Sequence, residues 1–197
     1  SRPSTVYAIV EAEKTALYRS DDMGYHWRKV NDSNSVAMRP FYFGHLYVDP
    51  VDHDTVYKPG FSYAVSRDGG KSFSGAGGGF SASTHSDHHA IWVNPEDTNH
   101  QLIGTDGGVY ESRDGGQHWR FFQNLPLSQF YRVAYDMQEP YNVYGGLQDN
   151  GSWKGPSRKA NGIKNGDWVN VGGGDGFYVF PDPTDDNIVY FESQGGN

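Results

Sequence analysis

Imidazole and carboxylate side chains gather in the stretch His85-Ser86-Asp87-His88-His89. Such groups can ligate zinc or a similar ion, contact a ligand, or form hydrogen bonds within the fold. Because His88 and His89 are adjacent at the start of a predicted strand, their side chains should point to opposite sides. No second histidine cluster completes a metal shell, although His45 begins the preceding predicted unit. Hydrogen bonding, metal binding and ligand contact all stay open. We take His85, Asp87 and His88 as candidate ligand-binding residues and assign no metal or cofactor.

Three other aspartates stand beside glycine, at Asp106, Asp149 and Asp175. Asp-Gly is a common turn dipeptide, and this role suffices for Asp106. Asp149 lies between Gln148 and Asn150, and Asp175 lies in a run of glycines that would let a ligand approach the backbone. A pair of such carboxylates could also serve as the acid and the base or nucleophile of a glycoside hydrolase. The further candidate ligand-binding residues are therefore Gln148, Asp149, Asn150 and Asp175.

A repeated octapeptide gives the elements that must position these residues. Segments 20–27, 66–73 and 112–119 each read Ser-x-Asp-x-Gly-x-x-aromatic, and successive copies are 46 residues apart. The Ser and Asp side chains can accept backbone hydrogen bonds in a turn, the Gly adopts conformations that other residues resist, and the aromatic ring should be buried beneath the turn. We therefore predict a structural role for Ser20, Asp22, Gly24, Trp27, Ser66, Asp68, Gly70, Phe73, Ser112, Asp114, Gly116 and Trp119.

Each period holds four segments of strand length. In the third they are His89–Val93, Gln101–Thr105, Gly108–Ser112 and His118–Phe122. Four short strands in about 46 residues are typical of a propeller blade. We name these strands A to D, from the propeller axis outward. The sequence predicts an all-β fold, a β-propeller segment spanning 1–197 with about four four-stranded antiparallel blades plus partial ones. We expect it to belong to a larger propeller, with a closed four-bladed ring as the alternative.

Strand alternation separates the two sides of such a blade. The C–D turns, which hold the octapeptides, and the A–B turns should share one side. The D–A and B–C loops should share the other. The candidate residues fall in D–A and B–C loops, so we expect them to gather on one face near the central channel, where propeller ligands usually bind.

Composition excludes several classes of function. The net charge is −8 and the 16 Lys and Arg residues are scattered, so we expect no nucleic-acid partner. The chain has no Cys, which rules out disulfides and thiolate metal sites. Its apolar runs are far shorter than the roughly 18 residues of a membrane helix, so no membrane span is expected.

The octapeptides resemble the Asp-box, or BNR repeat, of sialidases, sortilin-type VPS10 domains and xyloglucanase-like glycoside hydrolases. Segments 85–92, 145–153 and 172–177 are similar to bacterial sortilin-like exported proteins. The resemblance implies a secreted or periplasmic module that binds a protein, peptide or glycan through its D–A and B–C loops, beside the remaining blades of a parent propeller or a second chain. The alternative is a xyloglucanase-like hydrolase with paired aspartates, so enzymatic activity stays open. A sialidase is disfavoured because its Phe-Arg-Ile-Pro motif is missing.

Overall fold

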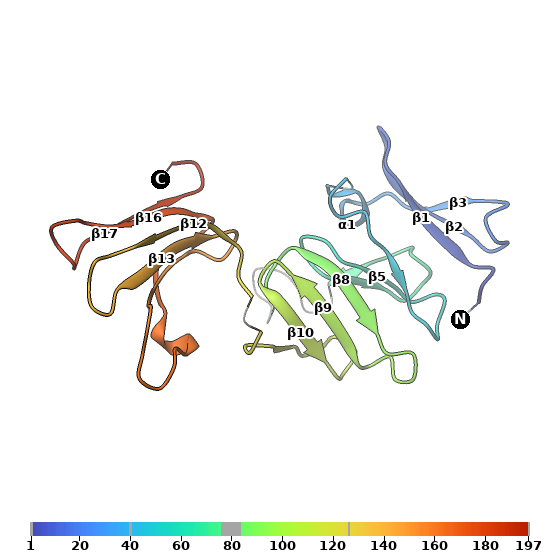
Figure 1. Cartoon of the computed structure of the whole chain (residues 1–197). Helices are drawn as coiled ribbons and strands as arrows, with labels where there is room; N and C mark the ends of the chain where they lie inside the picture. The colour runs from blue at the N-terminus through green and yellow to red at the C-terminus, as the bar shows by residue number, and fades with distance from the viewer. Residues whose placement is uncertain (1, 40, 76–83, 126, 197) are drawn as a thin grey trace. The chain divides into compact units, whose positions relative to one another are not determined.

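The computed structural model describes residues 2–39, 41–75, 84–125 and 127–196. Their regular structure is β-strand, apart from the single-turn helix α1 (Asn34–Ala37) and the 3-10 helix η1 (Asn165–Asp167). The chain forms two compact units, Ser1–Asn124 and Leu125–Asn197, which are described separately below (Figure 1). The all-β prediction is confirmed.

The first unit contains one three-stranded and two four-stranded antiparallel sheets, each ordered as in the sequence (Figure 1). The three-stranded sheet consists of β1 (Val6–Val10), β2 (Ala16–Ser20) and β3 (Arg28–Asn31). The next consists of β4 (Tyr47–Val48), β5 (Val56–Lys58), β6 (Ala64–Ser66) and β7 (Ser74–Gly75). The third consists of β8 (His88–Val93), β9 (Gln101–Thr105), β10 (Gly108–Ser112) and β11 (Arg120–Phe121).

The second unit contains a four-stranded sheet and a two-stranded sheet, both antiparallel. The larger consists of β12 (Phe130–Tyr135), β13 (Asn142–Leu147), β14 (Ser152–Pro156) and β15 (Val169–Gly172). The smaller pairs β16 (Gly176–Pro181) with β17 (Val189–Ser193). β16 packs against β12 and β13. The predicted A strands correspond to β4, β8, β12 and β16, so the expected four-stranded antiparallel unit is confirmed.

Aromatic and branched side chains between the two four-stranded sheets of the first unit form a buried cluster. Its members are Tyr57, Tyr63, Val65, Ile91, Ile103, Tyr110 and Trp119. They alternate along short strands, which sends one face of each strand inward. Each fully buried large apolar side chain contributes about 1.5–3 kcal/mol. This cluster holds the two sheets together and so fixes the loops at their ends.

The three octapeptides form the turns between C and D strands, and we call them the octapeptide turns. In the second, Ser66 Oγ donates to Asp68 Oδ1 at 2.8 Å and accepts the Gly70 N–H at 2.8 Å, while Asp68 Oδ1 accepts the Ser72 N–H at 2.9 Å. The other two copies repeat this pattern. The glycines Gly24, Gly70 and Gly116 have φ near +90°, a conformation that favours glycine.

The aromatic ring that ends each octapeptide is buried to different degrees. Trp119 is buried and Phe73 is half-buried, but Trp27 is 44% exposed. The predicted burial of Trp27 is therefore wrong. Its indole instead folds over its own turn, where Nε1 donates to the Gly24 carbonyl at 2.8 Å. Trp119 belongs to the buried cluster between the two four-stranded sheets, and that packing explains its different environment.

The A–B turns share a hydrogen bond that the sequence pattern did not reveal. An aspartate at the end of the A strand accepts the hydroxyl of a tyrosine eight residues later, at 2.7 Å for Tyr57 and Asp49, 2.8 Å for Tyr144 and Asp136, and 2.9 Å for Tyr190 and Asp182. The sheet β8–β11 has Asn94 and Leu102 at these positions. These bonds tie the turn to the second strand of its own sheet.

Candidate functional site

Backbone hydrogen bonds define two sides of the sheets in the first unit. On one side the octapeptide turns meet A–B turns, since Gly69 N–H donates to Asp54 O at 2.8 Å and Gly115 N–H donates to Asn99 O at 3.0 Å. On the other side a D–A loop meets B–C loops, because Asp87 donates to Phe61 O and accepts from Asp106, both at 3.2 Å. We call these the turn side and the loop side. The candidates His85, Asp87 and His88 lie on the loop side.

Hydrogen bonds within the fold engage His85 and His88. His85 Nδ1 lies 3.0 Å from Ser86 O, and its ring packs so tightly on Gly107 that an added Cβ there would lie 2.5 Å from it. His88 is 1% exposed, with its ring nitrogens 3.3 Å from the Thr84 hydroxyl and the Gly60 carbonyl. Burial lowers the pKa of His88, so it is neutral at pH 7. Its position is that of a structural histidine.

His89 and Asp106 form a close side-chain contact on the loop side that sequence reasoning missed. His89 Nε2 lies 2.9 Å from Asp106 Oδ1, and both side chains are partly exposed, at 35% and 21%. His89 is the second residue of β8, and Asp106 lies in the B–C turn after β9, so the pair spans one sheet edge. Because the two residues are far apart in the sequence, the sequence pattern alone indicates only a turn role for Asp106.

Aromatic rings from the preceding D–A loop surround His89. The imidazole packs edge-on against Tyr42 at 5.1 Å and stacks on Phe43 at 5.6 Å, between ring centroids. The Arg39 guanidinium lies over the same two rings, at 5.2 Å and 5.6 Å. Tyr42 is 44% exposed. We call Arg39, Tyr42, Phe43, His89 and Asp106 the loop cluster.

A buried lysine donates a hydrogen bond to the loop that carries the aromatic residues of the loop cluster. Lys58 ends β5, is buried, and donates to the carbonyls of Phe43 and Pro59. Burial lowers the pKa of Lys58 to about 8. The bond to Phe43 O holds the D–A loop that carries the aromatic rings, so Lys58 is a positioning residue for this cluster.

The second unit brings Asp149 and Asp175 together. Asp175, in the D–A loop before β16, accepts the Asp149 N–H on its Oδ1 at 2.6 Å. The same loops also join through Gly151 N–H and Gly174 O at 2.8 Å. Asp175 O accepts the Gln194 N–H at 3.0 Å, which adds a second B–C loop. The two carboxylate-bearing residues therefore share one loop junction.

Amide and aromatic side chains flank this junction. Gln129 Nε2 donates to Gln148 Oε1 at 2.9 Å, and Asn150 Nδ2 donates to Gln148 O at 2.8 Å. Tyr131 stacks on Phe177 with centroids 4.7 Å apart and planes 2° apart. Burial, followed by the charges of Asp175 and Asp149, raises the pKa of Tyr131. All four candidates of the second unit, Gln148, Asp149, Asn150 and Asp175, thus lie in adjoining loops.

Backbone strain is concentrated in the D–A and B–C loops of both units. Among the described residues, the non-glycine residues with positive φ are Met23, Arg39, Asp87 and Asp149. All but Met23 lie in D–A or B–C loops. Asp tolerates this conformation better than Arg, which adopts a φ of 47° at Arg39. Strained backbone gathers at binding and catalytic sites, where surrounding contacts hold it in place.

Neither a metal cluster nor a membrane span is found in the described part of the chain. No group of three or more His, Cys, Asp or Glu side chains there is arranged to hold a metal ion. No helix there is both long and apolar enough to cross a membrane.

No family model and no curated protein matches this chain. Solved structures do. The GH74 enzyme of Niastella koreensis matches 96% of this chain with 32% of its own, at 18% identity and a TM-score of 0.53. The GH74 xyloglucanase from Xanthomonas campestris covers 94% of this chain with 32% of its own, at 14% identity and a TM-score of 0.47. YCF48 bound to D1 peptide covers 80% of this chain with 49% of its own, at 14% identity and a TM-score of 0.45.

The first of these likenesses defines the class of fold. It exceeds a TM-score of 0.5, and at 18% identity it shows the fold alone, a β-propeller of four-stranded antiparallel sheets. The chain spans about a third of the length of the GH74 structures that it matches. The prediction of a β-propeller segment is thus confirmed.

Proposed function

We propose that this chain is the ligand-binding part of a secreted or periplasmic β-propeller. Its D–A and B–C loops recognise a glycan, a peptide or a protein surface. The loop cluster is the observation that supports this proposal best. It joins an exposed tyrosine ring, a guanidinium stacked on aromatic rings and a His–Asp pair 2.9 Å apart.

This combination suits a polar ligand with some apolar surface. Arg39 offers hydrogen-bond donors, and Asp106 offers acceptors. The aromatic faces take up the C–H face of a sugar ring or an apolar peptide side chain. The His89–Asp106 contact, the stacking and the Lys58 bond hold these groups in place before a ligand arrives, which lowers the entropy cost of binding.

Array binding tests the proposal with a matched pair of tyrosine variants. Wild-type chain is applied to glycan and peptide arrays beside Tyr42→Ala and Tyr25→Ala. Both tyrosines are exposed, but Tyr25 lies in an octapeptide turn on the turn side. We expect a reproducible set of bound ligands that Tyr42→Ala loses and Tyr25→Ala keeps. Absence of any bound ligand, or equal binding by the two variants, would overturn the proposal.

A glycoside hydrolase is the second candidate, because Asp149 and Asp175 share one loop junction. Glycosidases use two carboxyl groups about 5–10 Å apart. The bond from Asp149 N–H to Asp175 Oδ1 brings the two residues together. That bond also engages one oxygen of Asp175, which is why we rank binding first. Release of reducing sugar from xyloglucan, lost in a folded Asp175→Asn variant, would establish the enzyme instead.

A further inference from the structure

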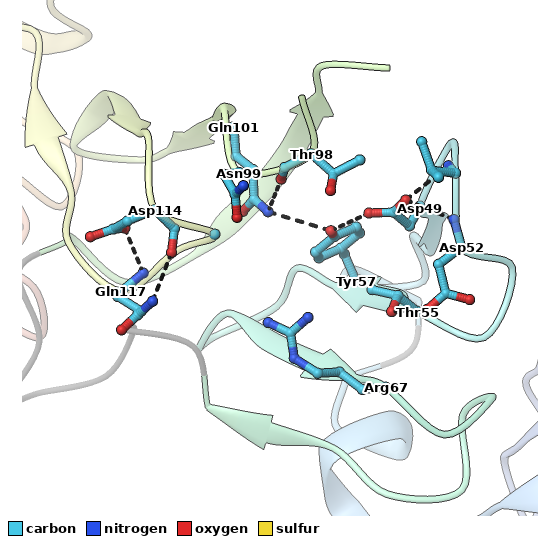
Figure 2. Close-up of a pocket in the computed structure, with 12 residues that line it drawn as sticks. Asp49, Asp52, Thr55, Tyr57, Arg67, Thr98, Asn99, Gln101, Asp114 and Gln117 are labelled. Atoms are coloured by element: carbon cyan, nitrogen blue, oxygen red, sulfur yellow. Dashed lines mark hydrogen bonds between the residues drawn. The ribbon is translucent and has the colours of Figure 1, made fainter. Parts of the chain in front are cut away.

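A pocket of about 260 Å³ opens on the turn side of the first unit. Figure 2 shows the residues that line it. It lies between the sheets β4–β7 and β8–β11. Asp49 and Asp52 reach it from one A–B turn, and Thr98 and Gln101 reach it from the next. Arg67 and Gln117 come from the two octapeptide turns. Both sheets must therefore be in place for the pocket to exist.

The walls of the pocket are fixed by internal hydrogen bonds. Asp49 Oδ1 accepts the N–H groups of Val51 and Asp52, and its Oδ2 accepts the Tyr57 hydroxyl. Gln101 Nε2 donates to Thr98 O at 2.9 Å, and its Oε1 accepts the hydroxyl of Tyr63 at 3.1 Å. These bonds hold the lining groups in one arrangement (Figure 2). A ligand would meet a preformed polar surface.

Two lining groups stand apart from this network. Within the described residues, neither the Arg67 guanidinium nor the Thr98 hydroxyl forms a hydrogen bond or an ion pair. Arg113 occupies the equivalent position one repeat later and pairs with Glu111 at 2.8 Å. The counterpart of Glu111 in the earlier repeat is Val65, which cannot accept a hydrogen bond through its side chain. The sequence thus leaves the donors of Arg67 available at the pocket.

The charges of the lining disfavour an anionic ligand. Asp49, Asp52 and Asp114 give three carboxylates against the single guanidinium of Arg67, so an anion would be repelled. The donors of Arg67 call for a ligand that also carries hydrogen-bond acceptors, which a simple cation lacks. A neutral ligand rich in hydroxyl groups can donate to carboxylate and amide oxygens and accept from Arg67 and Thr98. The volume is slightly below that of drug-sized sites and suits a single sugar ring.

We propose that this pocket binds one neutral monosaccharide unit, as a second site on the side opposite the loop cluster. Saturation-transfer NMR on the full chain tests it with glucose, galactose, mannose and xylose, and with glucuronate and glucosamine as charged comparisons. We expect transfer to at least one neutral sugar and a loss of affinity of about tenfold or more in Arg67→Ala. Arg113→Ala is the matched control and should bind as the wild type does.

Other variants separate this site from misfolding and from the loop cluster. Thr98→Val removes the second available group and should also weaken the signal while the thermal midpoint is retained. Tyr42→Ala should leave the signal unchanged, whatever it does to array binding. The proposal is overturned if only the charged sugars bind, if no sugar binds, or if Arg67→Ala and Arg113→Ala bind equally well.

Discussion

Individual carboxylates in this chain have two different roles, and the hydrogen bonds of each carboxylate show which role it has. The octapeptide aspartates accept several hydrogen bonds from their own turns, whereas Asp106 pairs with a histidine of strand β8. Bonds from Ser72 and Ser66 lower the pKa of Asp68 to about 2. Bonds from the His26 backbone and side chain likewise lower the pKa of Asp22 to about 2. Asp22 and Asp68 thus stabilise their turns as carboxylates.

Acid should therefore weaken the fold through these turns. A carboxyl group whose pKa is lowered by folding contributes stability above its unfolded pKa of about 3.9, and loses it as the pH falls through its folded pKa. We expect the thermal midpoint of the wild type to fall between about pH 4 and pH 2. Asp68→Asn should start lower and fall less over this range. Parallel midpoint curves for the two proteins would contradict this role.

The serine of an octapeptide turn should matter more than its exposed neighbour. Ser66 is fully buried and accepts the Gly70 N–H, so Ser66→Ala leaves a buried donor unpaired. We expect a loss of about 1–3 kcal/mol in the free energy of unfolding, measured by denaturant titration. Ser72→Ala removes a bond at an exposed site and should cost less than about 1 kcal/mol. Equal losses would show that burial of Ser66 does not decide its effect.

At the scale of elements, close approach of strands depends on glycine. A Cβ at Gly146 in β13 would lie 2.4 Å from the backbone of Gly176 and 2.5 Å from that of Phe177, in the sheet packed against it. Backbone cannot move aside as a flexible side chain can. We expect Gly146→Ala to destabilise the second unit by about 3 kcal/mol. Gly173→Ala meets nothing within 4 Å and should be close to neutral in the same denaturant titration.

The elements were more predictable than the contacts between their loops. Identical spacing of Ser20, Ser66 and Ser112 predicted the four-stranded units, because local turn chemistry sets where each strand ends. The expected last strand 118–122 is reduced to β11 (Arg120–Phe121), since the His118 N–H bonds Asp114 rather than a neighbouring strand. The pair His89–Asp106 could not be predicted, because it depends on how strand β8 and the B–C turn after β9 meet in space.

At the scale of the whole molecule, aromatic surface is left uncovered on the last hairpin. Tyr178 and Phe180 stack on each other at 5.4 Å, and Phe180 stands opposite Tyr190 across the pair β16–β17. All three rings are about half exposed. Exposed aromatic patches favour association. We predict that the isolated chain self-associates in light scattering, and that Phe180→Glu reduces this association. A monodisperse, compact wild-type monomer would contradict it.

The affinity of two aspartate variants for one array-selected ligand tests our central claim most directly. That claim assigns recognition to the loop side and stability to the octapeptide turns. By titration calorimetry, Asp106→Asn should weaken binding by about tenfold, or 1.4 kcal/mol, with an unchanged thermal midpoint. Asp68→Asn should lower the thermal midpoint and bind as tightly as the wild type. If Asp106→Asn binds normally while Asp68→Asn loses the ligand without loss of stability, the claim is wrong.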